Sequence, residues 1–312
     1  MFLDRISDCG WVLAIRERLC GQEAFLGHTQ RPFKLIRNPW RYWCADPFLI
    51  HHDGVEYIFC EAFDILKDRG ILAYRTIDRR GRVSKLRPCL DTGSHLSYPH
   101  IFRHDGQMYM IPESGAAGEV ALYRATQFPD RWQKQTVLLK DISACDTDLV
   151  SHQGDTYLLT QVFDRSQIPY VYDSLYLYIW DGARFRPCSA EPIVHGAQKA
   201  RNAGAIFEHE GTLHRVSQDC AEMYGESITF HQIDRLDRNG YEEHPIQQLR
   251  VSDIRLDRPN TFEGIHTYNA DERYEIIDLQ RKKWFRPARL LYLFLYKIRT
   301  VFSTKPNRRN VT

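Results

Sequence analysis

The sequence predicts an all-β protein, a five-bladed β-propeller followed by a short, basic, helical C-terminal tail. Three observations carry this prediction. A hairpin motif recurs five times along the chain. Aromatic residues, which favour strands, make up 12% of the 312 residues. From residue 281 onwards, ten Lys and Arg occur without a single acidic residue. We therefore expect the propeller over residues 1–280 and the tail over residues 281–312.

Each copy of the repeat has the features of a β-hairpin. The first copy, ADPFLIHHDGVEYIFCE from Ala45, places an Asp-Gly turn between two runs of apolar and aromatic residues. Such turns suit residues with positive φ. About 50 residues per copy accommodate four short strands, the size of a propeller blade. The hairpins are expected near residues 45–61, 97–113, 145–161, 202–218 and 263–278.

The N-terminal segment is expected to complete the propeller. Residues 1–40 would supply the strand that closes the last blade, a frequent way for a propeller ring to close.

Other fold classes fit the sequence less well. A β-sandwich would not need five similar units. Folds built from βαβ units need helical crossovers, and the sequence shows none.

The net charge of +2 conceals two oppositely charged parts. Without the ten cations of the tail, residues 1–280 contain 32 Lys and Arg and 40 Asp and Glu, a net charge of −8. An acidic body argues against a nucleic-acid partner. The eight cysteines include no C-x-x-C pair, which argues against a zinc knuckle or a dithiol redox site.

The repeat also aligns polar side chains in two columns at the open end of the hairpins. A turn centred between Asp53 and Gly54 would place Asp46 opposite Glu61. The first column holds Asp46, Tyr98, Asp146, Ala203 and Glu263, and the second holds Glu61, Glu113, Gln161, Gln218 and Asp278. Equivalent blade ends converge on one mouth of the channel, so the columns predict an acidic ring there. Such a ring needs water, a metal or proton chemistry, unless its members only cap turns and join neighbouring blades.

Other polar and aromatic residues crowd the same mouth and favour a sugar as ligand. Carboxylates, amides and Arg bind sugar hydroxyls, and aromatic rings stack on the C–H face of a sugar. The candidate substrate-binding residues are Trp43, Glu61, Tyr98, Asp148, Arg201, Asn202, Arg215, Gln218, Asp219, His266 and Tyr268. No phosphate loop or dinucleotide fingerprint occurs. No cofactor or metal ligand set is assigned; the acidic channel could hold a divalent cation such as Ca²⁺, but no loop has EF-hand spacing.

Nine short motifs in order make the sequence resemble a known family. They are ADPFL at 45, HLSYPHIF at 95, YMIPES at 109, FPDRW at 128, CDTDL at 145, ARNAG at 200, HRVSQDC at 214, YG at 224 and IHTYN at 265. Over about residues 10–280 the chain resembles the N-terminal propeller domain of plant glucosamine inositolphosphorylceramide transferases and its bacterial stand-alone homologues. That domain is distantly similar to the five-bladed glycoside hydrolases and phosphorylases of families 43, 32 and 130. In the plant proteins, transfer is usually assigned to a separate C-terminal domain that this sequence lacks.

The resemblance implies roles for three carboxylates. Asp46 matches the Asp that serves the distant glycosidases as base or nucleophile. Tyr98 stands where those enzymes have a second Asp. Asp146 or Asp148 stands where they have the Glu that acts as the proton donor. Because two of the three positions depart from that pattern, we expect Asp46 as base or nucleophile, Glu113 as proton donor and Asp146 as an orienting carboxylate, with Glu61 as the alternative donor. Arg201, Arg215 and His266 would hold an anionic or hydroxylated part of the ligand.

The tail, over residues 281–309, combines its cations with Trp, Phe and Leu. That composition suits a helix lying on an anionic bilayer, while the alternative is a helix packed on a propeller face. The N-terminus lacks the pattern of a secretory signal. We therefore expect a cytoplasmic protein, peripheral on the inner membrane face.

Three functions remain open at this stage. The first is a glycosyltransferase-type enzyme of glycan or glycolipid biosynthesis, including envelope polysaccharide, acting on a lipid-linked or nucleotide-linked sugar. The second is a glycoside hydrolase or phosphorylase. The third is a non-catalytic, glycan-binding propeller that serves a partner transferase. A cytoplasmic address and a tail that binds membranes favour the first.

Overall fold

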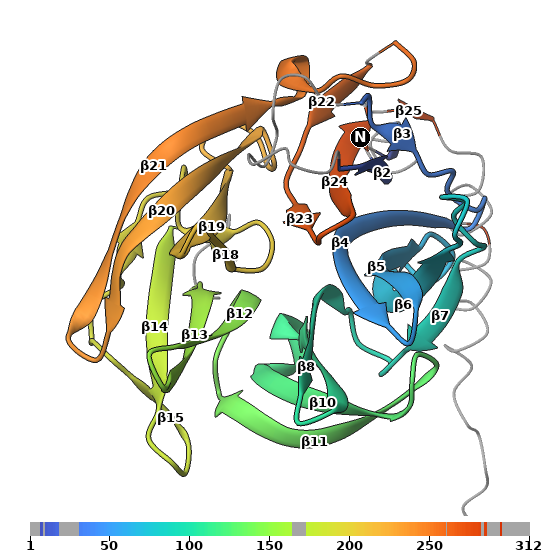
Figure 1. Cartoon of the computed structure of the whole chain (residues 1–312). Helices are drawn as coiled ribbons and strands as arrows, with labels where there is room; N and C mark the ends of the chain where they lie inside the picture. The colour runs from blue at the N-terminus through green and yellow to red at the C-terminus, as the bar shows by residue number, and fades with distance from the viewer. Residues whose placement is uncertain are drawn as a thin grey trace, which may run out of the picture.

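Five antiparallel sheets are arranged around a central axis, as the five repeats predict (Figure 1). The computed structural model describes residues 7, 8, 10–18, 31–163, 173–259, 261–281, 284, 285 and 294. Strands β4, β8, β12, β18 and β23 lie nearest the axis, one from each blade. The predicted five-bladed β-propeller is therefore confirmed.

The first two blades follow directly from the chain order. Blade 1 consists of β4 (Tyr42–His52), β5 (Val55–Asp64), β6 (Arg69–Ile77) and β7 (Arg87–Leu90). Blade 2 consists of β8 (Ser97–His104), β9 (Gln107–Glu113), β10 (Glu119–Gln127) and β11 (Arg131–Lys140), with a 3₁₀ turn, η1 (Gly115–Ala117), between β9 and β10. Successive strands pair with each other, so each blade is a meander from the axis outwards.

Blades 3 and 4 have the same plan with shorter additional strands. Blade 3 consists of β12 (Ala144–His152), β13 (Asp155–Val162), β14 (Ser174–Trp180), β15 (Phe185–Pro187) and β16 (Val194–His195). Blade 4 consists of β17 (Arg201–Asn202), β18 (Phe207–His209), β19 (Thr212–Asp219), β20 (Ser227–Asp237) and β21 (Gly240–Arg250), followed by the 3₁₀ turn η2 (Val251–Asp253).

Blade 5 is built from both ends of the chain. It consists of β22 (Phe262–Gly264), β23 (Tyr268–Ala270), β24 (Tyr274–Arg281), β2 (Trp11–Glu17) and β3 (Lys34–Leu35). Strand β2 pairs along its whole length with β24, from Trp11 opposite Gln280 to Glu17 opposite Tyr274. The prediction that the N-terminal part closes the last blade is thus confirmed. A further pair, β1 (Ser7–Asp8) with β25 (Trp284–Phe285), joins the flanking segments.

The hairpin turns have the backbone that the sequence predicts for four of the five blades. Asp53 and Gly54 adopt φ values of 47° and 78°, both in the left-handed region. The pairs Asp105-Gly106, Gln153-Gly154 and Glu210-Gly211 do the same. In blade 5, Asp271 takes the turn instead and accepts the backbone N–H groups of Arg273 and Tyr274 on its side chain. This local bond replaces the missing glycine.

Each junction between neighbouring blades has its own hydrophobic core. Alternate residues of a strand face opposite neighbours, so Ile58 belongs to the core between blades 5 and 1, while Phe59 belongs to that between blades 1 and 2. Separate clusters join blades 2 and 3, 3 and 4, and 4 and 5. The apolar residues therefore hold the blades to each other and leave the axis to polar side chains.

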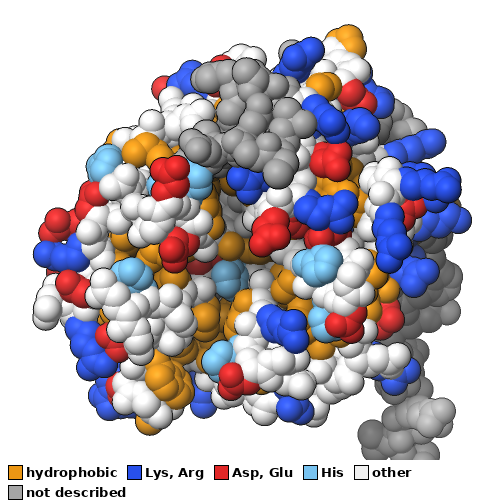
Figure 2. Space-filling model, viewed as in Figure 1, with side chains coloured by type: hydrophobic (Ala, Val, Ile, Leu, Met, Phe, Trp, Pro, Cys, Tyr) orange, Lys and Arg blue, Asp and Glu red, His pale blue; other side chains and the backbone are white. Residues whose placement is uncertain are grey.

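The surface is unevenly charged. Figure 2 shows Lys and Arg side chains gathered over the region of β3 and blade 1, where blades 5 and 1 meet. The predicted helical tail over residues 281–312 falls outside the described residues, apart from Arg281, Trp284, Phe285 and Phe294. Among the described residues, no helix has the length and hydropathy needed to span a membrane.

Candidate functional site

The site begins with a bulge repeated in the innermost strands of three blades. In blade 1, Ala45 pairs with Glu61 and Phe48 with Phe59, so one extra residue lies in β4 around Asp46. Asp46, Tyr98 and Asp146 all adopt left-handed φ values, of 50°, 43° and 47°. A bulge redirects the side chain of the extra residue. The expected pairing of Asp46 with Glu61 is therefore wrong by one residue, because uniform hairpin counting does not allow for the bulge.

Asp46 lies buried at the centre of a network that joins blades 1, 2 and 5. Its Oδ2 accepts the backbone N–H of Tyr98 at 3.1 Å, and its Oδ1 accepts the hydroxyl of Thr267 at 3.0 Å. Nε2 of His266 lies 3.7 Å from the same Oδ1. Burial raises the pKa of Asp46 to about 6; Asp146 and Asp278 add to the rise, and His266 opposes it. Asp46 thus titrates close to neutral pH.

Asp278 holds His266 in place. Its Oδ2 lies 2.7 Å from Nδ1 of His266 and accepts the backbone N–H of Asp46 at 2.9 Å. Its Oδ1 accepts the backbone N–H groups of His266 and Thr267. The indole of Trp11 stacks on the imidazole, with ring centroids 3.7 Å apart. Burial lowers the pKa of His266, but the carboxylates of Asp278 and Asp46 outweigh it, so the net shift is upwards and favours the imidazolium.

A second group of charged side chains joins blades 2, 3 and 4. Nε of Arg201 donates to Oδ2 of Asp146 at 2.5 Å, and Nε2 of Gln218 donates to the same oxygen at 3.1 Å. Glu113 accepts the backbone N–H of Asp146 at 3.3 Å, and its carboxylate lies 3.9 Å from Nη2 of Arg201. The structure thus brings together the three predicted catalytic carboxylates, Asp46, Glu113 and Asp146, and the charge of Asp146 helps to raise the pKa values of Asp46 and Glu113.

The pKa values of two glutamates are raised by their surroundings. Burial, and after it the charge of Asp146, raises the pKa of Glu113 well above the ordinary value. Burial, and after it the charge of Asp46, does the same for Glu61. Groups whose environments separate their pKa values are suited to opposite roles in proton transfer. Here Glu113 or Glu61 can supply a proton while Asp46 accepts one.

An aromatic stack lies beside Glu61 in blade 1. The rings of Trp43 and Phe63 are stacked with centroids 4.5 Å apart. The ring centroids of His95 and Phe63 are 6.3 Å apart. Nε2 of His95 is 3.6 Å from Oε1 of Glu61. Trp43, Phe63 and His95 are partly exposed, so this stack combines an accessible ring surface with a carboxyl group, which suits the C–H face and hydroxyls of a sugar.

Three predicted binding residues are buried among other protein groups. The hydroxyl of Tyr98 donates to Asp148 and accepts the backbone N–H of Gly204, and Asp148 also lies 3.1 Å from Nδ1 of His100. The hydroxyl of Tyr268 donates to Glu275 within the core between blades 4 and 5. Tyr98, Asp148 and Tyr268 therefore join strands and blades together.

Arg215 and its neighbours occupy the interior of blade 4. Arg215 forms two hydrogen bonds with Glu243, of 2.8 and 2.6 Å, and donates to the side chain of Asn202. Asn202 in turn donates to the backbone carbonyls of Asp146 and Leu159, which ties blade 4 to blade 3. Asp219 accepts the backbone N–H of Ala221 and so closes a turn. Within the fourth repeat, Arg201 and Gln218 donate hydrogen bonds to the carboxylate of Asp146.

Blade 5 differs most from the repeat columns. Glu263 of the first column is exposed on β22, whereas His266 and Thr267 contact Asp46. Sequence reasoning missed Trp11 and Thr267 as site residues. Thr267 lies between the predicted residues His266 and Tyr268, so the IHTYN motif could have identified it as a site residue. No sequence pattern marks Trp11, because its strand, β2, lies far in the sequence from β24, with which it pairs.

Asp46, His266 and Asp278 are of the kinds that ligate metals, and their ligand atoms lie within 4.8 Å of one another. Both oxygens of Asp278 already accept two hydrogen bonds each, and Nδ1 of His266 faces Asp278. Only Oδ1 of Asp46 and Nε2 of His266 would be available to a divalent cation. The arrangement is better described as an imidazole bonded to the carboxylate of Asp278 at 2.7 Å, with the carboxylate of Asp46 3.7 Å from its other nitrogen.

The sequence is similar to proteins of one family. The family model for glucosamine inositolphosphorylceramide transferase 1, N-terminal, matches residues 38–285. A protein of that name from Arabidopsis thaliana is 35% identical over 237 residues, which is 73% of this chain and 30% of the relative. The one from Oryza sativa subsp. japonica is 32% identical over 234 residues, covering 73% of this chain and 31% of the relative. The chain thus spans about a third of the length of these relatives.

Among solved structures, the catalytic domain of the Coprinopsis cinerea GH62 α-L-arabinofuranosidase superposes with a TM-score of 0.56 at 10% identity, covering 77% of this chain and 91% of that one. The Bombyx mori GH32 β-fructofuranosidase superposes with a TM-score of 0.51 at 14% identity, covering 75% and 56%. At these identities the likeness concerns the fold.

Proposed function

This chain belongs to the family of the N-terminal part of glucosamine inositolphosphorylceramide transferase 1, and from that premise we propose that it is a carbohydrate-active protein that transfers a sugar at the carboxylates of the channel. The relatives are named as transferases of a sugar, and the similar folds as hydrolases of sugar bonds. The observation that carries the proposal is that the pKa values of buried Asp46 and partly exposed Glu113 are both raised, to about 6 for Asp46 and well above the ordinary value for Glu113, which suits them to opposite proton-transfer roles.

The proposed reaction assigns one step to each carboxyl group. Glu113, whose raised pKa favours the protonated form, donates its proton to the oxygen that leaves the anomeric carbon of the donor. Asp46, mostly ionised at pH 7, either accepts the proton of the acceptor hydroxyl or attacks the anomeric carbon itself. In the first route the acceptor oxygen displaces the leaving oxygen in one step and the anomeric centre is inverted. In the second route the acceptor oxygen then displaces Asp46 from the glycosyl ester, its proton passes to the ionised Glu113, and the anomeric centre is retained. Arg201 fixes Asp146, which in turn orients Glu113 through its backbone N–H.

The proposal is tested by a binding and transfer assay on the purified protein. Nucleotide sugars, free sugars and glycolipid headgroups are screened by thermal shift, and hits are assayed for transfer to sugar and inositol acceptors. A ligand at a hundredfold excess over its Kd should raise apparent stability by about 2.7 kcal/mol. Trp43→Ala should weaken binding, while Trp180→Ala, at an exposed Trp of blade 3, serves as the matched control. Release of sugar to water alone would instead support a hydrolase, and binding without turnover would support a glycan-binding module.

The pH dependence of transfer follows from the two carboxyl groups. The pKa of Asp46 is raised to about 6, so the active, ionised base is lost as the pH falls through 6. The pKa of Glu113 is raised well above its ordinary value, so the proton donor is lost only as the pH rises through that higher value. We therefore expect kcat/KM to follow a bell-shaped pH profile with an acidic limb near 6. In the Asp46→Asn variant, residual activity should lack this limb; persistence of the limb would assign it to another group.

We also propose that the basic tail attaches the protein to the cytoplasmic face of the inner membrane, near a lipid-linked substrate. The tail carries ten Lys and Arg without an acidic residue. Each cation near an anionic bilayer contributes about 1 kcal/mol. Replacing Lys297, Arg299 and Lys305 together by Ala should therefore weaken binding to anionic vesicles by about 100-fold. Vesicle sedimentation measures this effect, and unchanged binding would contradict the proposal.

A further inference from the structure

The turn that joins β19 to β20 in blade 4 brings an exposed aromatic ring to the channel carboxylates. Tyr224 lies in this turn and is 40% exposed. The guanidinium of Arg201 lies 5.0 Å from the centre of its ring, and the ring centroids of Tyr224 and His266 are 5.5 Å apart. Arg201 is bonded to Asp146, and His266 adjoins Asp46. The ring of Tyr224 therefore lies beside one member of each of the two charged groups in the channel.

Backbone contacts fix the turn that carries Tyr224. Gly225 adopts a φ of 68°, and its carbonyl accepts the backbone N–H of Ile265 at 2.8 Å, which attaches the turn to blade 5. A Cβ atom on residue 225 would lie 2.7 Å from the indole of Trp11 and 3.0 Å from Cβ of His266, so only glycine allows this close approach. The ring of Tyr224 is therefore in position before a ligand arrives, which lowers the entropic cost of binding.

Tyr224 offers a ligand two kinds of contact beside carboxylates that are themselves buried. Asp46 is 5% exposed and Asp146 is 1% exposed, whereas the ring of Tyr224 is accessible. Within the described part of the chain, no group forms a hydrogen bond with its hydroxyl. A tyrosine hydroxyl both donates and accepts hydrogen bonds. The side chain thus combines an open apolar surface with a polar group that is free to bond a ligand.

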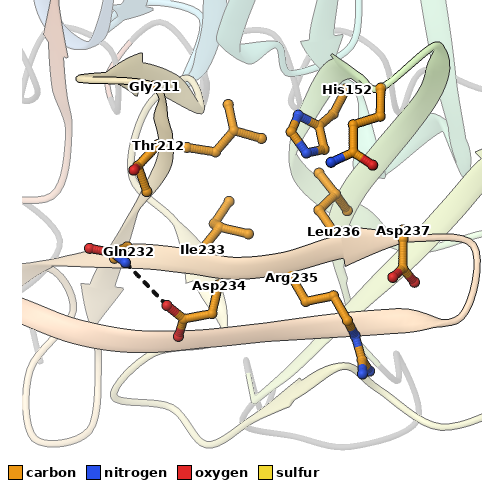
Figure 3. Close-up of a pocket in the computed structure, with 11 residues that line it drawn as sticks. His152, Gly211, Thr212, Gln232, Ile233, Asp234, Arg235, Leu236 and Asp237 are labelled. Atoms are coloured by element: carbon orange, nitrogen blue, oxygen red, sulfur yellow. Dashed lines mark hydrogen bonds between the residues drawn. The ribbon is translucent and has the colours of Figure 1, made fainter.

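Figure 3 shows a cavity of about 380 Å³ away from the channel, where His152 and Thr212 face β20. Its Asp and Arg side chains all have partners within blade 4, namely His244 for Asp234, Glu242 for Arg235 and two turn N–H groups for Asp237. No charged group in this cavity requires a ligand, whereas Tyr224 presents its ring and hydroxyl next to the groups proposed to react.

We propose that Tyr224 binds the sugar that is transferred, with its ring packed on the C–H face of the sugar and its hydroxyl bonded to a sugar hydroxyl. Aromatic rings present an apolar face for such packing, and the phenol adds a polar group at the edge of the same surface. This inference rests on the proposed transfer at Asp46, because a sugar whose anomeric carbon reaches Asp46 lies beside His266 and hence beside this ring. The contact is separate from that of Trp43, which lies in blade 1.

Calorimetric titration with sugars and their sugar-free counterparts tests the inference. The probes are UDP-glucose, GDP-mannose and methyl α-glucopyranoside, with UDP and GDP as the counterparts. Tyr224→Ala should weaken binding of a sugar-bearing probe by about tenfold, because the stacking surface is lost, while binding of UDP or GDP should not change. Tyr224→Phe keeps the ring and loses one hydrogen bond, so its affinity should stay within about fivefold of the wild-type value.

The pH profile of transfer separates sugar binding from support of the neighbouring imidazole. In Tyr224→Ala, KM for the donor should rise and the acidic limb should stay near 6, because His266 keeps its contact with Asp278 at 2.7 Å. A shifted limb without a change in sugar binding would show that Tyr224 acts only by supporting His266, and would overturn the inference.

Tyr109→Ala is the matched control in blade 2. Tyr109 is a half-buried ring stacked on Phe102 with centroids 5.8 Å apart, four residues along β9 from Glu113, and its loss should leave sugar binding unchanged. Equal weakening by Tyr224→Ala and Tyr109→Ala, or unchanged sugar binding in Tyr224→Ala when the wild type binds sugar, would overturn this inference alone. Absence of saturable binding of every sugar probe by the wild type would overturn the proposed transfer as well.

Discussion

Replacing Asp46 with Asn is expected to lower the rate of sugar transfer by about 10²–10⁴-fold, the usual contribution of a positioned base. Asn keeps the shape of the side chain and can still accept the N–H of Tyr98 and contact Thr267, and Asn tolerates left-handed φ values. It cannot accept a proton or form a glycosyl bond. The single-turnover rate with saturating donor measures the effect, alongside the melting temperature.

A comparison with Glu113→Gln separates the two carboxyl groups. The Gln variant cannot donate a proton to the leaving oxygen, so its defect should be large for donors with a poorly acidic alcohol leaving group. With a nucleotide donor, whose phosphate leaves without protonation, the defect should shrink, whereas Asp46→Asn should be impaired with either donor. Equal activity of wild type and Asp46→Asn in every assay would remove Asp46 from the chemistry and leave a sugar-binding role for the channel.

Replacing Arg215 with Leu is expected to destabilise the protein by about 3–5 kcal/mol, the cost of leaving one member of a buried ion pair without its partner. Arg215 is fully buried and binds both oxygens of Glu243. Burial works to raise the pKa of Glu243, but Arg215 outweighs it and lowers it to about 2, so the remaining carboxylate would be strongly destabilised. Chemical denaturation followed by fluorescence measures the change.

The double variant Arg215→Leu/Glu243→Leu provides the control. Because it removes both charges, much of the lost stability should return. The sequence suggested instead that Arg215 holds the ligand. A single variant of normal stability that binds sugar poorly would favour that assignment over the structural one.

Hairpin repeats made the fold predictable in detail. Turn glycines, Tyr residues and apolar alternation are local signals, and each recurs where a blade requires it. The grouping of the candidate carboxylates also followed from the repeat, because a position repeated in each blade lies at the same height along the axis. The pairing of Asp46 with Glu61 failed by one residue, since a bulge leaves no distinct mark in a single sequence.

The residues that the sequence assigned less well are those whose partners lie in other blades. Arg215, Tyr98 and Tyr268 are polar or aromatic residues near the motif, as a ligand contact would be, yet each finds its partner inside the protein. Which strand a side chain bonds across a blade junction depends on packing between distant segments. Local pattern therefore found the site but could not separate residues that line it from those that support it.

Closure of the ring by β2 has a consequence for when the residues around Asp46 are brought together during folding. Trp11 stacks on His266, and β2 pairs with β24, which carries Asp278, so these contacts join residues more than 250 positions apart. Such long-range contacts form late in folding, because the intervening chain must be ordered first. The imidazole beside Asp46 is fixed only when the ring is closed, so a partly folded chain would hold Asp46 without the imidazole that opposes the rise of its pKa.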